Sequence, residues 1–507
     1  MFSKPLTGPA QAEKGPVDQD NASCRAASVT ATFEDLLGGE NTDIALLGKM
    51  RLVNDAIDNI GWTRFHLKLF CLSGFGYAVD TLVAMLQSIV AAQAYAELGA
   101  ANRGYRTGLT LSLYAGFLVG ALFWGFTADV IGRRIAFNTT LFGSSISAIV
   151  AGAAPNWPVL GLFIALLGFA AGGNLVLDPT VFLEFLPGSK QWLVTAMATW
   201  WGFGQAAAGF LAWGYFSRSE WSCDTSDPSS CTWQNNKGWR LIMFTGGSVI
   251  LVMSITRLLM FRLHETPKYM LSAGRDSELV EQLQALATKY DRPFSLTVEQ
   301  LEACGTIENK SSGKRSYHNI VHQLVGHLKG LLVTQKLALS TGLVWLSWTL
   351  IGLAYPLFFI FLPSLISSRV PDASGTFSET WRDYTITSRR YTMAIGAVIT
   401  AALFFGNTGI NTPAQNLGLS CSISVGINIY YGTLYAYTAE VLPSAHRATG
   451  NGVGIALNRV MGLLSAVVAV ASDTTTVTPL YICAALFIVL TIVSAALPFE
   501  PLGHRAS

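Results

Sequence analysis

The sequence predicts an all-α protein that crosses a membrane many times. Of its 507 residues, 51% are hydrophobic and only 13% are charged. Apolar stretches of about twenty residues recur along it, and this is the length that a helix needs to cross the hydrocarbon core of a bilayer. The formal net charge is +2 and the sequence has no long basic stripe, which argues against a nucleic-acid partner. We therefore expect a bundle of spanning helices whose main partner is the lipid bilayer.

Apolar runs predict eleven spanning helices in two groups. The ranges expected before a polar central stretch are 69–92, 109–128, 135–154, 159–182, 193–216 and 241–261. The ranges expected after it are 337–362, 391–405, 417–438, 452–471 and 480–497. The chain thus divides into a first half at 66–262 and a second half at 337–498, and a short tail follows at 499–507.

Polar segments precede and separate the halves. Residues 1–65 contain no short apolar run with a cleavage site, so we expect a cytoplasmic tail rather than a signal peptide. Residues 52–66 have apolar positions at helical spacing and are expected to form an interfacial helix on the inner membrane face. Residues 263–336 are rich in Lys and Arg and have amphipathic helix patterns, so the positive-inside rule places this central loop in the cytoplasm.

The two halves repeat each other. The stretch "VFLEFLPGSKQ", after the fourth span, resembles "YTAEVLPSAHR" near the end of the second half. Glu184 precedes Glu440 by the same number of residues by which Arg133 precedes Arg389. Two landmarks at one offset indicate a duplicated unit, as in transporters built from repeated halves.

The repeat fails at one place. In the first half, a complete span at 109–128 precedes the arginine pair, whereas the corresponding stretch of the second half reads "SSRVPDASGTFSETWRDYTITS" (Ser367–Ser388). This stretch cannot span hydrocarbon, because its polar side chains would lose water without gaining partners. We expect that the eighth of twelve spans is missing near residues 384–388, through a mis-joined gene model or an alternative transcript. Natural divergence to a loop that re-enters the bundle is the alternative.

Several motifs resemble one family of membrane transporters. The stretches "GFTADVIGRR" (Gly125–Arg134), "ETPKYML" and "YAYTAEVLPSAHRATG" are similar to motifs of the sugar-porter-like group of the major facilitator superfamily. The stretches "GFGYAVD" and "NRVMGLLSAVVA" resemble a fungal branch related to synaptic-vesicle-glycoprotein-like and organic-ion transporters. The resemblance implies the major facilitator fold of two pseudo-symmetric helical halves. It also implies that the chain moves a small organic solute by alternating access, with protons as the expected coupling ion and the plasma membrane as the expected location. The seventh span, "LVWLSWTLIGLAYPLFF", lacks the Gln-rich sugar motif, which argues against a hexose substrate.

The resemblance also implies a cytoplasmic gate that latches the outward-open state. Its residues are Gly125, Asp129, Arg133, Arg134 and Glu184 in the first half and Arg389, Arg390, Glu440 and Arg447 in the second. Gly125 would leave room for close helix contact, Asp129 would face a helix N-terminus, and the arginines would form charged hydrogen bonds. The alternative for these charges is an ordinary positive-inside anchor and surface network. The second half keeps only the arginine pair of the motif, so we expect its latch to be broken.

Charged residues inside the spans are candidates for coupling and binding. Asp80 and Asp178 are expected to carry protons, because a carboxylate in lipid is costly and should face the interior; a structural hydrogen-bonding role is the alternative. Arg459 must find a carboxylate, backbone carbonyls or an anionic substrate, and we expect it to be either a gate or substrate contact in the cavity or part of a fixed structural ion pair. Arg257 lies near a helix end, and we expect its guanidinium to reach the membrane surface.

Aromatic and polar side chains on the spans predict a pocket, because aromatic residues with a few polar groups make an adaptable site for organic solutes. The candidates are Asn174, Trp200, Trp201, Gln205, Trp345, Trp348, Tyr355, Tyr435 and Tyr437. For each of them alone, packing or an interfacial belt is the alternative. The sequence leaves the identity of the solute, the direction of transport and the oligomeric state open.

Cys223 and Cys231 flank a loop that is expected outside the membrane, so we predict a disulfide between them.

The remaining motifs exclude other classes of function. The sequence has no C-x-x-C pair or His cluster to suggest a metal, and no phosphate-binding loop or nucleophile elbow to suggest a cofactor or an enzyme. We interpret the glycines of "GFAAGG" and "GNGVG" as helix contacts. The rival hypothesis is a non-transporting sensor or interaction protein, or an inactive truncated isoform.

Overall fold

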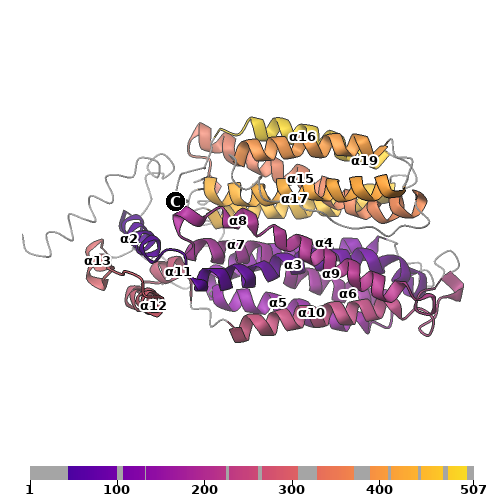
Figure 1. The fold of residues 1–507 in the computed structure, drawn as a ribbon, viewed down its shortest axis with the longest axis horizontal. Helices are drawn as coiled ribbons and strands as arrows, with labels where there is room; N and C mark the ends of the chain where they lie inside the picture. The colour runs from indigo at the N-terminus through magenta and orange to yellow at the C-terminus, as the bar shows by residue number, and fades with distance from the viewer. Residues whose placement is uncertain are drawn as a thin grey trace, which may run out of the picture. The chain divides into compact units, whose positions relative to one another are not determined.

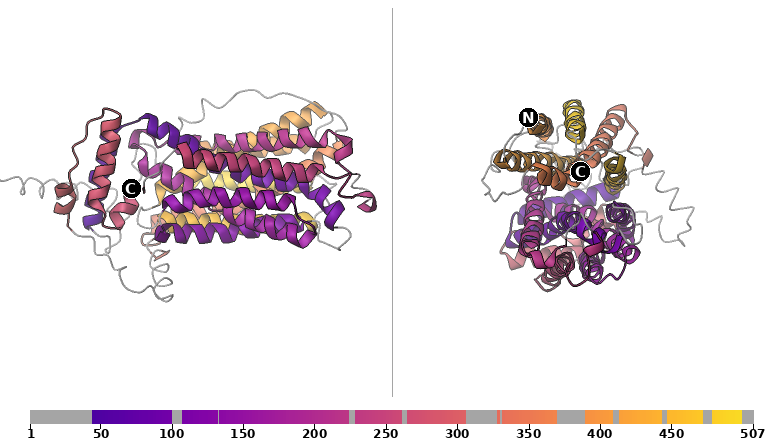
Figure 2. Two further views of the ribbon diagram at one scale, coloured as in Figure 1. Left: turned by 90° about the horizontal axis from the view of Figure 1, so that it is seen from below. Right: turned by 90° about the vertical axis from the view of Figure 1, so that its right-hand side faces the viewer.

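The structure is a computed structural model that describes residues 44–99, 107–131, 133–223, 228–260, 265–305, 328–329, 331–369, 389–408, 413–442, 447–471 and 478–498. Among these residues, every regular element is a helix. The chain divides into two compact units. One consists of Met1–Gly61 with Pro267–Arg315, and the other consists of Trp62–Thr266 with Ser316–Ser507. The latter contains the long helices in Figures 1 and 2.

The long helices form a bundle of two halves. Those of the first half are α3 Arg64–Ala94, α4 Gly108–Ile131, α5 Arg133–Gly152, α6 Trp157–Ala171, α7 Asn174–Phe185, α9 Thr199–Phe216 and α10 Gly238–Met260. A π-helical turn at Tyr95–Gly99 continues α3, and the short helix α8 Leu193–Ala196 precedes α9. Those of the second half are α15 Gln335–Arg369, α16 Arg389–Thr408, α17 Pro413–Val441, α18 Arg447–Ala471 and α19 Thr478–Ala495. The long helices run side by side along the bundle (Figure 1), and Figure 2 shows many of them end-on.

Helices occupy all eleven ranges that the apolar runs predict. By length and composition, six are able to cross a membrane: Arg64–Gly99, Gly108–Gly125, Arg133–Gly152, Trp157–Phe185, Gly238–Leu259 and Gln335–Phe358. Met393–Thr408 and Pro479–Ala495 are shorter apolar helices. The all-α membrane bundle is therefore confirmed, whereas length and apolarity identify fewer spans in the described residues than the eleven predicted.

Glycines bring α4 and α6 into close contact. A Cβ added at Gly116 would lie 2.1 Å from the carbonyl oxygen of Ala165, and one added at Gly168 would lie 2.4 Å from that of Leu113. Gly172 likewise lies against the α4 backbone. Backbones approach this closely only where neither helix has a side chain at the contact. The interpretation of the "GFAAGG" glycines as helix contacts is thus confirmed.

In the second half, α15 runs antiparallel to α17. The indole Nε1 of Trp348 donates to Thr438 Oγ1 at 3.0 Å. About two turns further along α15, the ring centroid of Tyr355 lies 5.4 Å from that of Tyr431. Increasing residue numbers on α15 thus meet decreasing residue numbers on α17.

The next helix along the chain, α16, also runs antiparallel to α17. A Cβ added at Gly396 would lie 3.5 Å from Ile429, and one added at Gly426 would lie 2.3 Å from Thr400 Oγ1. Consecutive helices α15 and α16 therefore run in the same direction. In the first half, α4 lies in the sequence between α3 and α5. Residues 370–388, where the eighth span is predicted to be missing, lie outside the described residues.

The other unit joins the N-terminal segment to the central loop. It contains α2 Ile44–Ile60, α11 Pro267–Ser272, α12 Asp276–Lys289 and α13 Val298–Ala303. Val53, Ile57 and Ile60 on α2 are buried in one cluster with Leu279 and Leu283 on α12. The predicted amphipathic helix therefore ends before residue 66, and the central loop rather than a membrane surface covers its apolar face.

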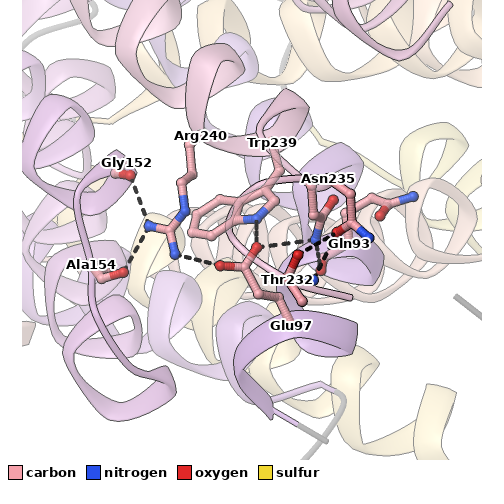
Figure 3. Close-up of polar contacts among 9 residues, drawn as sticks. Gln93, Glu97, Gly152, Ala154, Thr232, Asn235, Trp239 and Arg240 are labelled. Carbon is pink, nitrogen blue, oxygen red and sulfur yellow. Dashed lines mark hydrogen bonds and ion pairs between the residues drawn. The ribbon is translucent and has the colours of Figure 1, made fainter. Parts of the chain in front are cut away.

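A polar network closes the end of the first half opposite Arg133. Arg240 Nη2 donates to Glu97 Oε1 at 2.7 Å, and Trp239 Nε1 donates to Glu97 Oε2 at 2.9 Å (Figure 3). Arg240 Nη1 also donates to the carbonyl oxygens of Gly152 at 3.1 Å and Ala154 at 2.8 Å. One buried guanidinium thus ties together the last turn of the first span, the end of α5 and the start of α10.

The loop between α9 and α10 contains the predicted disulfide. Cys223 and Cys231 are bonded, with their Cα atoms 5.4 Å apart. Gln93 Nε2, from the end of α3, donates to the carbonyl oxygen of Cys223 at 3.2 Å. The disulfide thus holds the loop against the same end of the first half.

The glycine contact between α4 and α6 gives a test of the packing. Gly116→Ala should lower the melting temperature of the purified protein by roughly 5 °C, because the new methyl group would overlap a backbone carbonyl that cannot move aside. Gly209→Ala on α9 is the matched control, since a Cβ there meets nothing within 4 Å. Thermal unfolding followed by size-exclusion chromatography measures both. Equal melting temperatures for the two variants would contradict the contact.

The direction of α15 and α16 gives a test of the sequence itself. We expect messenger RNA across the codons for Trp381 to Arg390 to contain a further segment of roughly 20–25 mostly apolar codons, the length of one span. Reverse transcription and sequencing measure this, with the codons for α4 as the control for coverage. An uninterrupted join in every transcript would rule out the missing span.

Candidate functional site

Side chains from both halves line a cavity inside the bundle. The lining consists of Asp80, Thr81, Tyr114 and Trp201 from the first half and Tyr355, Pro356, Tyr431, Asn458 and Arg459 from the second. About 20 Å³ is open to the centre of a water molecule, which is room for one or two waters. The cavity is too small for an organic solute in this conformation, so the lining must move apart to admit one.

An ion pair joins the two halves in this lining. Arg459 Nη2, on α18, donates to Asp80 Oδ1, on α3, at 3.1 Å. Both residues are buried, and the guanidinium carbon lies 4.4 Å from the ring centroid of Phe117. Within the described part of the chain, Arg459 Nε has no hydrogen-bond partner. The guanidinium thus keeps an N–H group that a ligand could bind.

Aromatic and amide groups hold the rest of the lining in place. The Tyr431 hydroxyl donates to Asn458 Oδ1 at 2.9 Å, and Asn458 Nδ2 donates to the carbonyl oxygen of Trp348 at 3.2 Å. Thr81 Oγ1 donates to the carbonyl oxygen of Trp201 at 3.0 Å. The Tyr431 and Trp201 rings meet edge to face, with their centroids 5.1 Å apart. The result is an aromatic wall beside the ion pair.

Four of the residues singled out from the sequence line the cavity: Asp80, Trp201, Tyr355 and Arg459. The sequence reasoning missed Thr81, Tyr114, Pro356, Tyr431 and Asn458. Helical spacing could have found Tyr431, which lies one turn before Tyr435, and Asn458 is the neighbour of Arg459 in the sequence. Tyr114 carried no such signal, because it is a lone tyrosine in an apolar span.

The other pocket candidates lie outside the lining. Trp348 and Tyr435 form a second layer with ring centroids 4.4 Å apart, and Gln205 is a hydrogen-bond partner of the Tyr355 side chain. Trp345 Nε1 donates to the carbonyl oxygen of Gly450 at 3.1 Å. Trp200 packs among phenylalanine rings, and Tyr437 and Asn174 are fully buried.

Asp178 lies inside the first half, where its partner is Arg257. Arg257 Nη2 lies 3.3 Å from both carboxylate oxygens, and neither side chain is exposed. Arg257 also donates to the carbonyl oxygens of Leu72 and Phe137. The expectation that Arg257 reaches the membrane surface was wrong, because carbonyls on two neighbouring helices and one carboxylate hold it in the interior.

The predicted gate is described in part. Arg133 at the start of α5 forms an ion pair with Glu184 near the end of α7, while Arg134 is exposed. A Cβ added at Gly125 would lie 3.7 Å from Val176, an ordinary contact, so this conformation does not require glycine there for close packing. The side chains of the remaining gate residues lie outside the described part: Asp129, Arg389, Arg390, Glu440 and Arg447.

Sequence reasoning also missed a histidine beside the gate. The backbone N–H of Thr63 donates to His66 Nδ1 at 3.1 Å, so the ring proton is on Nε2. His66 Nε2 donates in turn to the carbonyl oxygen of Phe185 at 2.9 Å. The start of α3 is thus bonded to the end of α7, next to Glu184. Among the described residues, no group of three or more His, Cys, Asp or Glu side chains could hold a metal ion.

Known proteins resemble both the sequence and the fold. A family model described as "Sugar (and other) transporter" matches residues 68–359. The major facilitator-type transporter hxnZ of Emericella nidulans is 34% identical over 94% of this chain and 91% of its own length. The MFS siderochrome iron transporter 1 of Ceriporiopsis subvermispora is 34% identical over 93% of this chain and 94% of its own length.

A solved structure shares the fold. The proton:xylose symporter XylE matches with a TM-score of 0.60 at 14% identity, over 89% of this chain and 98% of its own. The family model covers more than half of the chain, and the relatives in the two fungi align over nearly all of it. This chain therefore belongs to the sugar-transporter family of the major facilitator superfamily and is an integral membrane transporter of the multi-pass type.

Proposed function

We propose that the chain moves a small organic solute across a membrane by alternating access, with protons as the coupling ion and the Asp80–Arg459 pair as the coupling site. The position of this pair carries the proposal: it is buried, lines the cavity and joins α3 of one half to α18 of the other. Two halves that rock against each other around a central site must strain or break such a bond. The plasma membrane is the location we propose.

Charge balance supplies the coupling. Protonation of Asp80 removes the negative charge of the pair and leaves the positive charge of Arg459 unbalanced in a low dielectric. Leaving one member of a buried ion pair without its partner in this way costs about 3–5 kcal/mol. An anionic group on the solute can replace the carboxylate, and Arg459 Nε is already without a partner among the described residues. A proton on Asp80 and an anion on Arg459 therefore favour each other, which is the thermodynamic requirement for symport.

The lining favours a solute with an anionic group next to a flat, partly apolar body. Arg459 supplies the planar donor fork, and the rings of Tyr114, Trp201, Tyr355 and Tyr431 supply faces for stacking. The names of the similar proteins point to different cargoes, siderochrome iron for one and xylose with a proton for another. They support solute transport in general, so the choice of an anion rests on the ion pair.

Asp80→Asn tests the coupling. The amide cannot carry a proton but resembles the protonated acid, so proton-driven uptake should fall at least about tenfold while counterflow between compartments of equal pH is retained. The assay uses proteoliposomes and a panel of labelled aromatic monocarboxylates, with xylose as the neutral comparison. Glu278→Gln is the control, because it removes a carboxylate from a half-exposed pair in the other unit. Undiminished proton-driven uptake by Asp80→Asn would contradict the proposal.

A non-transporting role is the second candidate, and one observation favours it. Consecutive helices α15 and α16 run in the same direction, and the segment between them has the polar sequence of Ser367–Ser388. A second half that lacks a spanning return could bind a solute without completing the transport cycle. Saturable binding of a labelled carboxylate without flux into proteoliposomes, by a protein whose transcript has the uninterrupted join, would establish this role.

A further inference from the structure

A polar stripe runs along α3 from the cavity into the first half. Ser73, Gly76, Tyr77 and Asp80 are spaced at i, i+3, i+4 and i+7, which places them on one face of the helix. A Cβ added at Gly76 would lie 1.5 Å from Asp178 Oδ2. The Asp178 carboxylate therefore lies directly against the stripe, one helical turn from the residue that carries the Asp80 carboxylate.

Buried polar atoms without partners surround Asp178. Within the described residues, Ser73 Oγ, the Tyr77 hydroxyl, Asn174 Oδ1 and Nδ2, and Ser254 Oγ have no hydrogen-bond partner. All four residues are buried. Asn174 lies one turn from Asp178 on α7, and Ser254 lies one turn from Arg257 on α10. Polar groups buried in this way are normally satisfied by internal water, so the surroundings of the Asp178–Arg257 pair are suited to bind water.

Arg257 does not depend on Asp178 alone. Its Nε and Nη2 donate to the carbonyl oxygen of Leu72 at 3.1 and 2.6 Å, and its Nη1 donates to that of Phe137 at 2.7 Å. The guanidinium carbon lies 3.6 Å from the Phe137 ring centroid. Among the described residues, its hydrogen bonds to Asp178, at 3.3 Å, are longer than those to the two carbonyl oxygens. Asp178 can therefore gain a proton while Arg257 keeps its other partners.

Tyr77 is close both to Asp178 and to the cavity lining. Its ring centroid is 5.2 Å from that of Trp201, which lines the cavity. Its hydroxyl is close enough to both Asp80 and Asp178 to interact electrostatically with each. A hydroxyl can donate one proton while it accepts another, so Tyr77 is suited to connect the two carboxylates.

From these contacts we propose that Asp178 is a second proton-carrying site, which exchanges protons with Asp80 through Tyr77 and internal water. The inference rests on the proton coupling proposed above. In the step, the Asp80 acid gives a proton, directly or through a water, to the Tyr77 hydroxyl. The hydroxyl passes its own proton on, and the Asp178 carboxylate accepts a proton. No other bond changes, and Asp80 returns to the carboxylate that pairs with Arg459. Among the described residues, the charged and titratable groups that interact with Asp178 are Arg257 from α10 and Tyr77 from α3, and the Phe137 carbonyl of α5 lies beside Arg257.

Tyr77→Phe is the sharpest test, because it removes an unpaired hydroxyl and keeps the ring contacts. In proteoliposomes loaded with a labelled aromatic monocarboxylate, we expect proton-driven flux to fall about tenfold or more while counterflow at equal pH is unchanged. Asp178→Asn should likewise lower the proton-driven flux and leave counterflow unchanged, and it should change the dependence of the proton-driven flux on pH. Tyr481→Phe, at a half-exposed position on α19, is the control. Unchanged proton-driven flux in Tyr77→Phe would overturn the relay, and so would an Asp178→Asn variant that loses counterflow as well.

A spectroscopic measurement separates this proposal from the proposed function. Infrared difference spectra of the purified protein between low and high pH should show a protonated-carboxyl band that persists in Asp80→Asn and disappears in Asp80→Asn/Asp178→Asn. If that band titrates but no proton-driven uptake occurs in the wild type, the transport proposal fails while the second site stands. If uptake is proton-driven and the band is absent from Asp80→Asn, only the second site fails.

Discussion

Lipid cannot solvate a charge, so the bundle has to neutralise the charged side chains that it buries, and the architecture depends on how it does so. Arg257 and Arg459 show two solutions. Arg257 has its donors on two backbone carbonyls and a carboxylate of the same half. Within the described part of the chain, Arg459 has one hydrogen bond, an aromatic contact and an Nε without a partner. The first arginine is bonded to three groups of its own half, whereas the second is bonded across the two halves.

The positions of the ion pairs follow the same division. Arg133–Glu184, Arg240–Glu97 and Asp178–Arg257 each tie helices of the first half together. The glycine contact between α4 and α6 adds to the packing of the same half. Asp80–Arg459 links the first half to the second. A change of charge at this pair therefore changes the contact between the two halves, whereas a change at the other pairs changes contacts within the first half.

Much of the fold could be predicted from the sequence, because span length and apolar composition reflect one physical requirement. The partners of Arg257 could not be predicted, since its place near a helix end does not reveal that carbonyls of α3 and α5 lie beside it. The sequence also could not predict what buries the apolar face of α2, because an amphipathic pattern is the same whether a membrane or another helix buries it. In the site, Asp80 and Arg459 stood out as charges inside apolar spans. Their contact with each other depends on how the halves meet, which no local pattern encodes.

The repeat relates the exposed face of α9 to the second-half counterpart of α4. At the offset that relates Glu184 to Glu440, α9 corresponds to α18, and α18 packs along α4. The second-half counterpart of α4 would therefore pack along α9. There, Phe203, Phe210 and Trp213 are 63%, 69% and 74% exposed. The Asp80–Arg459 pair lies on the α4–α18 side of the bundle, and both of these helices are described. Alternating access requires both sides of the cavity to close, so a spanning helix beside α9 is what would separate a transporter from a protein that only binds its solute.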